Sequence, residues 1–117
     1  MKNEFKAKFN FETRKAESKR IKEKYEDRFP IIITKANNCT MKKIDKNKFL
    51  VPGDLSIGQI LYVVRRRLTL GAEEAIFLFV NNNVLAASSQ TIATVYESHA
   101  DEDGFLYMTY CNENVFG

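Results

Sequence analysis

The sequence predicts an α+β domain, and three of its segments carry that prediction. Residues 29–34 are rich in β-branched side chains, which is typical of a strand. Residues 56–68 place apolar side chains at helical spacing and predict an amphipathic helix. Residues 75–80 form an unbroken apolar run that predicts a further strand. We expect the sheet formed by such strands to pack one face on the helix.

The first 27 residues are polar and predict an N-terminal extension of two helices. Residues 12–26 contain neither Gly nor Pro and predict a basic amphipathic helix, for which Asn10 is a suitable N-cap. A shorter helix or turn would precede it. Residues 1–28 contain ten Lys or Arg and six Asp or Glu, so this part carries a local positive excess. A solvated helix face is the simplest interpretation, and a surface for acidic partners is the alternative.

Two strands are expected between the extension and the central helix. Pro30 suits the beginning of the first strand, where a missing N–H donor is tolerated. A polar loop at residues 36–47 follows. Residues 48–51 predict the second strand, and Pro52-Gly53 closes it.

The central helix has clear signals at both ends. Ser56 and Gln59 match a capping box at its start. The three arginines at 65–67 lie in its last turns, where cations interact favourably with the helix dipole, and Gly71 would stop it. Helical spacing places five apolar side chains on the core side: Ile57, Ile60, Leu61, Val64 and Leu68.

The remaining segments complete the predicted fold. Residues 81–83 predict a turn, residues 91–98 a short helix and residues 105–110 the last strand. Two strands, a long helix and two further strands are the pattern of the β-grasp, or ubiquitin-like, fold with a four-stranded mixed sheet. We expect three parts, which are a helical extension at 1–27, a ubiquitin-like domain at 28–111 and a C-terminal tail at 112–117.

Length and composition suit one globular domain, since 28% of the 117 residues are charged and 44% are hydrophobic. No apolar run approaches the ~20 residues that a membrane-spanning helix needs. The first residues lack the apolar stretch of a signal peptide. We therefore expect a cytoplasmic chain, whose membrane contact would need surface binding or a covalent lipid.

The sequence offers little catalytic chemistry. Cys39 and Cys111 lack CxxC spacing, and His99 is the only histidine, so a zinc site has poor support. A thiol nucleophile with His99 as its base lacks any local signature, and there is no Gly-rich phosphate loop. The arginines at 65–67 and the basic first helix suggest nucleic acid, but no aromatic-basic motif of an RNA-binding module is present. We expect no enzyme activity, metal, cofactor or nucleic-acid partner.

The strand at 48–51 carries a different signal, because three successive positions are apolar. A strand alternates its faces, so Phe49 and Leu50 cannot both face one core. In a β-grasp this second strand lies at an edge of the sheet. An apolar edge is an aggregation hazard unless it is used, and the natural use is to accept a partner's extended peptide as an added strand.

The chain resembles one family closely, block by block and in order. The matching blocks are Phe11-Glu12, Arg14 to Ser18, Arg28 with Pro30-Ile31, Ile44 to Lys46, Lys48 to Pro52, Asp54-Leu55, Gly58-Gln59, Ala75 to Phe77, Phe79 to Asn81, Asp103 to Tyr107, Thr109-Tyr110, Glu113-Asn114 and Phe116-Gly117. They are similar to the autophagy-related protein 8 family, which includes the GABA-receptor-associated protein and microtubule-associated light chain 3. Residues 84–90 depart from the family pattern because they lack its prolines.

The resemblance implies a modifier that is conjugated through Gly117. An activating enzyme and a conjugating enzyme would pass its acyl group to the amine of phosphatidylethanolamine, and a cysteine protease would process and deconjugate it. A terminal glycine suits a narrow channel to a catalytic cysteine because it has no side chain and wide backbone freedom. The implied role is in autophagosome formation, with the lipidated form on the cytoplasmic and lumenal faces of the autophagosomal membrane.

The resemblance also implies two pockets that hold linear aromatic-x-x-aliphatic motifs of cargo receptors. The first would take the aromatic side chain and be lined by Glu17, Ile21, Pro30, Ile32, Lys48, Leu50 and Phe105. The second would take the aliphatic side chain and be lined by Phe49, Val51, Pro52, Leu55, Ile60 and Val63. Three further cations, with Lys48, would meet acids beside the motif: Arg28, Lys46 and Arg67. Ile32, Ile60 and Val63 could equally be ordinary core residues.

Phe77 and Phe79 share one face of their strand by alternation. The family uses this surface for processing enzymes and for helical partner motifs, and burial beneath the N-terminal helices is the competing interpretation. Two other function classes stay open at this point, a non-conjugated peptide-binding adaptor and a modifier that is attached to proteins.

Overall fold

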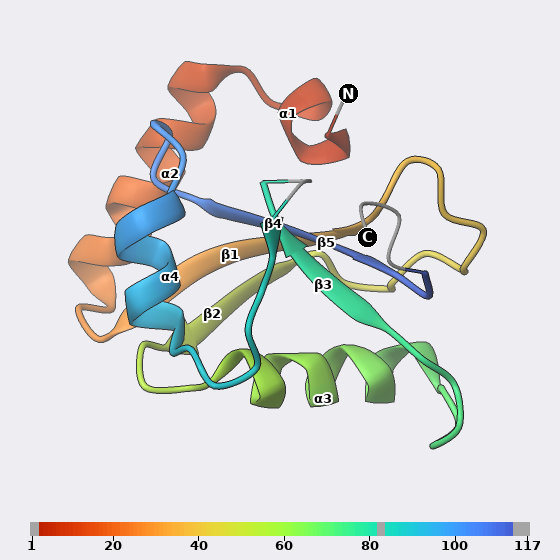
Figure 1. The fold of residues 1–117 in the computed structure, drawn as a ribbon. Helices are drawn as coiled ribbons and strands as arrows, with labels where there is room; N and C mark the ends of the chain where they lie inside the picture. Colours follow the sequence, from red (N-terminus) through yellow and green to blue (C-terminus); the bar gives the residue numbers. More distant parts are fainter. Residues whose placement is uncertain (1–2, 82–83, 114–117) are drawn as a thin grey trace.

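The computed structural model describes residues 3–81 and 84–113, which form a mixed β-sheet between two helical layers (Figure 1). The strands are β1 (Arg28–Lys35), β2 (Lys48–Pro52), β3 (Phe77–Val80), β4 (Val84–Leu85) and β5 (Leu106–Cys111). The helices are α1 (Glu4–Lys8), α2 (Phe11–Lys24), α3 (Ile57–Leu68) and α4 (Ile92–His99). The element order confirms the predicted α+β architecture with its two-helix extension.

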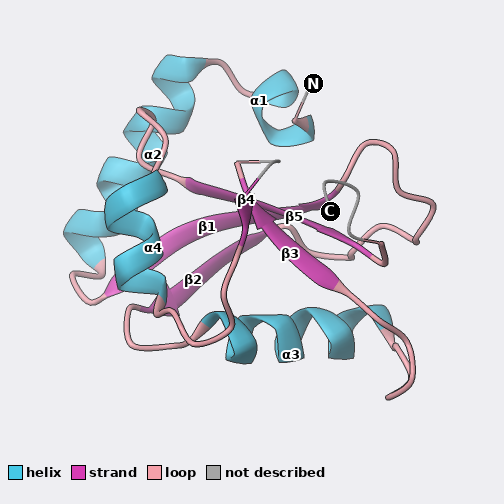
Figure 2. Cartoon of the chain, in the orientation of Figure 1, coloured by secondary structure: helices cyan, strands magenta, loops and turns pink. Residues whose placement is uncertain are grey.

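The strand order across the sheet is β2-β1-β5-β3-β4. The central pair, β1 and β5, runs parallel with Ile31 opposite Leu106, whereas the other neighbouring strands are antiparallel. In Figure 2, α3 lies across one face of the sheet, while α1 and α2 lie on the other side. The β2 strand therefore forms one edge, as the sequence predicts.

The sheet has five strands where the sequence predicts four. The additional strand is the two-residue β4, in which Val84 pairs with Val80 and Leu85 pairs with Phe79. The chain reverses after β3 through Asn81, whose φ of 53° lies in the left-handed region that Asn tolerates. Two residues are too few to show an alternating pattern, so the sequence carried no strand signal there.

The N-terminal ends of the longer helices follow the sequence signals. The side chain of Asn10 accepts a hydrogen bond from the Thr13 amide at the start of α2. Ser56 and Gln59 form the predicted capping box at the start of α3. These bonds satisfy amide groups that have no partner within the helix.

The end of α3 differs from the prediction, because the helix stops at Thr69 and not through Gly71. Thr69 has a φ of 57° and ψ of 46°, and its amide donates to the carbonyl oxygens of Arg65 and Arg66. The guanidinium of Arg65 then bonds the carbonyl oxygens of Gly71 and Glu74. These hydrogen bonds hold a left-handed conformation at a residue with a Cβ, which is normally disfavoured.

Alternation along β1 divides the apolar side chains between two cores. Ile31 and Ile33 pack in the large cluster beneath α3, which also includes Val64 and Leu106. Ile32 faces the opposite side and packs with Phe5 of α1 and Ile21 of α2. The N-terminal helices are therefore integrated into the fold through a hydrophobic core of their own.

A buried polar cluster fixes α2 to the turn that precedes β5. The Asp103 side chain is fully buried, accepts from the Phe105 amide at 2.9 Å and accepts from the Tyr107 hydroxyl at 2.5 Å. Arg14 of α2 pairs with the same carboxylate, and the Ser18 hydroxyl donates to the Asp103 carbonyl oxygen. A buried carboxylate requires such partners, so this cluster specifies where α2 docks.

Candidate functional site

The exposed edge of β2 is the first component of the candidate site. Within the described sheet, β2 pairs with β1 alone, from Lys48 opposite Ile32 to Pro52 opposite Arg28. An edge strand of this kind offers main-chain groups on its free side to an incoming strand.

The two faces of β2 lead to different cores, which resolves the conflict between Phe49 and Leu50. Phe49 and Val51 are 8% exposed and pack in the cluster beneath α3. Leu50 is half-buried and packs against the cluster formed with the N-terminal helices. The apolar side chains on both faces of this edge are thus explained by cores on both sides of the sheet.

The structure brings the residues of the first predicted pocket together. Ile21, Ile32 and Phe105 lie in one buried cluster, and Leu50 packs against it. Pro30 is buried on β1 directly opposite Leu50. These buried side chains form an apolar base between α2 and β2.

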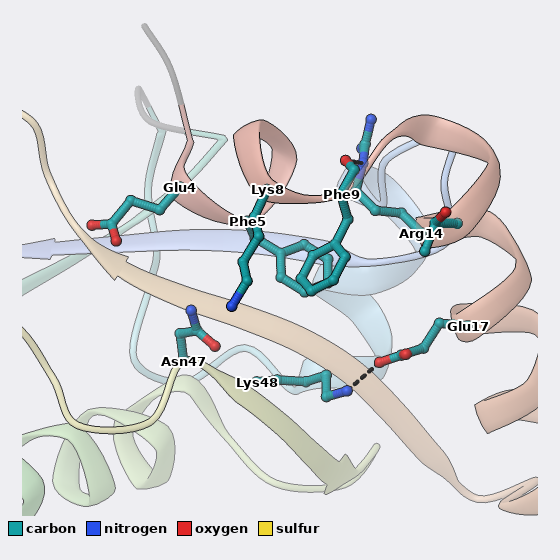
Figure 3. A pocket seen from close by; sticks show the side chains of 9 residues that line it. Glu4, Phe5, Lys8, Phe9, Arg14, Glu17, Asn47 and Lys48 are labelled. Carbon is teal, nitrogen blue, oxygen red and sulfur yellow. Dashed lines mark hydrogen bonds and ion pairs between the residues drawn. The ribbon is translucent and has the colours of Figure 1, made fainter.

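A charged pair closes one side of this region. The Lys48 ammonium of β2 forms an ion pair with the Glu17 carboxylate of α2, and both side chains are partly exposed (Figure 3). Because the two partners come from separate elements, this ion pair bridges α2 and β2 at the surface.

A cavity of about 380 Å³ opens next to this ion pair (Figure 3). Phe5 and Phe9 contribute its aromatic surface, with ring centroids 5.1 Å apart. Its lining residues are Glu4, Phe5, Lys8, Phe9, Thr13, Arg14, Glu17, Asn47 and Lys48. Sequence reasoning missed the contribution of α1, although two phenylalanines four residues apart in a polar segment were a usable signal.

The residues of the second predicted pocket lie on the α3 side of β2. Phe49, Val51 and Ile60 are buried in the core, so they can form only the base of a docking site. Pro52 and Leu55 are half-buried, and Val63 is 37% exposed. A surface depression of about 330 Å³ lies at Val63, Arg66 and Arg67.

The predicted cations divide between the two ends of β2. Lys46 and Arg67 lie near its start, with their charged groups 5.2 Å and 5.5 Å from the centroid of the Phe49 ring. Arg67 also bonds the Asp45 carboxylate at 3.2 Å. Arg28 is exposed opposite Pro52, at the far end. Positive charge is therefore concentrated where Lys46, Lys48 and Arg67 approach the start of the strand.

Phe77 and Phe79 pack at the same cluster but differ in burial. Phe79 is fully buried in a cluster with Ala36, Cys39 and Cys111, whereas Phe77 is half-buried and packs against that cluster. Phe79 presents no side chain at the surface, so its predicted role as a contact residue does not fit this conformation. The role of Phe77 stays a prediction.

Gly117 lies outside the described residues, while Cys111, at the end of the central strand β5, and Asn112 lie within them. Among residues 3–81 and 84–113, no group of three His, Cys, Asp or Glu side chains could hold a metal ion. No helix in the described ranges is both long and apolar enough to cross a bilayer.

The β-grasp sheet with its central helix and N-terminal helical layer defines a ubiquitin-like protein. Residues 13–117 match the family model described as autophagy protein Atg8, ubiquitin-like, and the chain belongs to this family. It is 53% identical to autophagy-related protein 8a of Arabidopsis thaliana, over 99% of this chain and 94% of that protein.

A fungal relative and a solved structure agree with this assignment. The chain is 50% identical to autophagy-related protein 8 of Schizosaccharomyces pombe, over 100% of this chain and 96% of the relative. It superposes on the crystal structure of Trypanosoma brucei ATG8 with a TM-score of 0.89 and 40% identity, over 95% of both chains. The chain is therefore an Atg8-family ubiquitin-like protein of autophagy.

Proposed function

We propose that this chain is a modifier that is joined through Gly117 to phosphatidylethanolamine and that recruits cargo receptors to the autophagosomal membrane. The geometry of β2 is the observation that carries the recruiting role, and family membership supports the conjugation. The unmodified form is cytoplasmic in this proposal, and the lipidated form is membrane-bound on both faces of the autophagosome.

The chain acts as the substrate of conjugation and not as its catalyst. An activating enzyme and a conjugating enzyme supply the cysteines, and a deconjugating cysteine protease reverses the step. The chain contributes a carboxyl group on a residue without a side chain, which can enter a narrow catalytic channel. The two acyl chains of the lipid then anchor the protein far more firmly than a single chain would.

The spacing of an aromatic-x-x-aliphatic motif fits the two faces of β2. A peptide added to the edge as a strand places residues i and i+3 on opposite faces, because side chains alternate with a period of two. One face leads to Leu50 and the α2 side, and the other leads to Val63 on α3. Following the family resemblance, the aromatic side chain is assigned to the α2 side and the aliphatic side chain to the α3 side.

The cations near the start of β2 select motifs that have acidic neighbours. Lys46 is exposed, and Lys48 and Arg67 already interact with carboxylates of the chain itself. Exposed ion pairs contribute mainly to association rate and selectivity, whereas the two buried side chains supply most of the affinity. A partner acid would replace Glu17 or Asp45 in these pairs.

Reconstitution tests the conjugation directly. Purified chain is incubated with activating enzyme, conjugating enzyme, ATP and phosphatidylethanolamine vesicles, and the products are separated by mass. We expect a lipid-sized mass increase for the native chain and none for Gly117→Ala. Ser89→Ala, an exposed change in another segment, is the matched control and should be conjugated normally.

Two other outcomes would replace this proposal. Binding of a Trp-x-x-Leu peptide without any adduct at Gly117 would identify a non-conjugated adaptor. An adduct on protein lysines, with none on lipid, would identify a modifier of proteins.

A further inference from the structure

The two cysteines of the chain meet in space although 71 residues separate them in sequence. Both thiols are buried, with residue exposures of 5% for Cys39 and 1% for Cys111. Each Sγ lies 3.7 Å from the same atom, Oδ1 of Asn112. Both side chains pack in one buried cluster with Ala36 and Phe79.

The fold of the β1–β5 pair explains this meeting. The Ala36 amide extends the strand pairing by donating to the Tyr110 carbonyl oxygen at 3.0 Å. The Cys39 amide then donates back to the Ala36 carbonyl oxygen at 3.1 Å, which closes a turn. This turn folds Cys39 over the end of β5, where Cys111 is the last residue.

We propose that Cys39 and Cys111 form a redox-responsive dithiol that hydrogen peroxide converts reversibly into an intramolecular disulfide. The disulfide ties the turn after β1 to the end of the central strand. Conjugation through Gly117 is not needed for this proposal. In a reducing compartment such a bond is transient, in contrast to the permanent disulfides of secreted domains.

The surroundings distinguish the roles of the two thiols. Burial alone would raise the pKa of Cys39. The net shift of this pKa is nevertheless downward, because Cys39 has hydrogen bonds with Cys111 and with the backbone of Met41 and Asn112, and because Lys35 carries a positive charge nearby. Lys35 is close because its ammonium donates to the Cys39 carbonyl oxygen at 2.5 Å. Burial and the neighbouring Cys39 raise the pKa of Cys111. Cys39 is therefore the thiolate that attacks first, and Cys111 resolves the product.

The oxidation proceeds in two balanced steps. The Cys39 thiol first loses its proton, and the thiolate attacks one oxygen of hydrogen peroxide. An S–O bond forms and the O–O bond breaks. The leaving hydroxide takes up the released proton and becomes water. The Cys111 sulfur then attacks the Cys39 sulfur, the S–O bond breaks, and a second water leaves with the Cys111 proton. The two sulfurs lose two electrons in total, and the peroxide gains them.

The position of Asn112 gives a small oxidant a short route to the thiols. Asn112 is exposed, and it lines a surface depression of about 520 Å³ together with Thr40 and Met41. Cys39 belongs to the polar segment between β1 and β2, which has few buried residues. Local opening of such a segment costs much less free energy than global unfolding.

The test treats reduced, folded chain with one equivalent of hydrogen peroxide, followed by alkylation with N-ethylmaleimide under denaturing conditions and peptide mapping. We expect a monomer without alkylatable thiols, a crosslinked peptide pair containing Cys39 and Cys111, and full reversal by dithiothreitol. Because the crosslink closes a long loop of the unfolded chain, the oxidised form should melt about 5–15 °C higher.

Three variants sharpen this test. Cys39→Ser and Cys111→Ser should each abolish the crosslinked peptide and leave one alkylatable thiol. Asn112→Asp keeps the shape of the side chain but places a negative charge beside both thiols, so oxidation should slow several-fold while circular dichroism stays unchanged.

Two results would overturn the proposal. One is a native chain whose two thiols both remain alkylatable after peroxide treatment that fully oxidises free dithiothreitol. The other is oxidation that yields only sulfinic acid or disulfide-linked dimers. If a serine variant does not fold, the peptide map of the native chain decides alone.

Discussion

Arg14 and Asp103 lie 89 positions apart in the sequence, yet Nη1 of the first is 2.5 Å from Oδ2 of the second. The Asp103 side chain is fully buried and the Arg14 side chain is 11% exposed. This ion pair connects the N-terminal helical layer to the turn that precedes β5, the central strand of the sheet. It therefore couples the docking of α2 to the position of β5.

Asp103→Ala should destabilise the chain by about 3–5 kcal/mol, because it leaves the largely buried Arg14 without its counter-charge. Urea denaturation followed by circular dichroism measures the effect. Lys43→Ala is the matched control, since Lys43 pairs with Glu4 through side chains that are 68% and 59% exposed. That change should cost at most about 1 kcal/mol. Equal losses for the two variants would contradict the role assigned to Asp103.

Asp101 should make the fold sensitive to acid. Burial alone would raise the pKa of its carboxyl group. The pKa is nevertheless lower than the ordinary value of 3.8, because Lys6 and the Asp103 amide donate hydrogen bonds to the carboxylate and Lys6 is positively charged. A carboxyl group whose pKa is lower in the folded state stabilises the fold above its unfolded pKa. That contribution is lost as the pH falls through the folded pKa.

The free energy of unfolding should therefore fall more steeply for the native chain than for Asp101→Asn between roughly pH 5 and pH 2. Lys6→Met should reduce the slope in the same way, because Lys6 lies 2.8 Å from the carboxylate. If the free energy of unfolding changes with pH identically in all three proteins, the Lys6–Asp101 pair does not contribute to acid sensitivity.

Thr69→Gly should stabilise the chain by about 0.5–1 kcal/mol, because Thr69 ends α3 in the left-handed region that glycine enters without steric cost. Thermal unfolding measures the gain. Ala93→Gly, inside α4, is the control and should destabilise by up to about 1 kcal/mol. If Thr69→Gly instead destabilises the chain, the entropy that glycine adds to the unfolded state outweighs the backbone strain that it removes from the end of α3.

Val63→Asp should weaken binding of a Trp-x-x-Leu peptide about tenfold or more, since a charge there opposes burial of the leucine. Isothermal titration with Trp-x-x-Leu and Trp-x-x-Ala peptides forms a double-mutant cycle. The native chain should discriminate strongly between the peptides, and the variant should discriminate little. Tyr62→Ser is the control, because Tyr62 is 61% exposed beside Leu70 and Ala72, in a different depression of α3.

If Val63→Asp still prefers the Trp-x-x-Leu peptide over the Trp-x-x-Ala peptide as strongly as the native chain does, the leucine of the peptide does not bind at Val63. Phe49→Ala is a poorer probe, since Phe49 belongs to the main core and its truncation costs about 3–5 kcal/mol of stability whatever its role in binding.

Local signals in the sequence determined most of the elements. The capping box at Ser56 and Gln59, the N-cap at Asn10 and the β-branched run in β1 each act over a few residues, so they can be recognised without the fold. The β-grasp order of the elements predicted that β2 lies at an edge, and alternation showed that its neighbouring apolar residues cannot share one core. The family resemblance extended these signals to named site residues.

Only the tertiary structure decided which distant side chains meet. The burial of Phe79, the contribution of Phe5 and Phe9 to the cavity beside Lys48, and the meeting of Cys39 with Cys111 all depend on how separate segments fold over the sheet. A sequence pattern specifies which face of a strand a residue occupies, but not which segment covers that face. That choice is made by packing between residues far apart in the chain, as between Arg14 and Asp103.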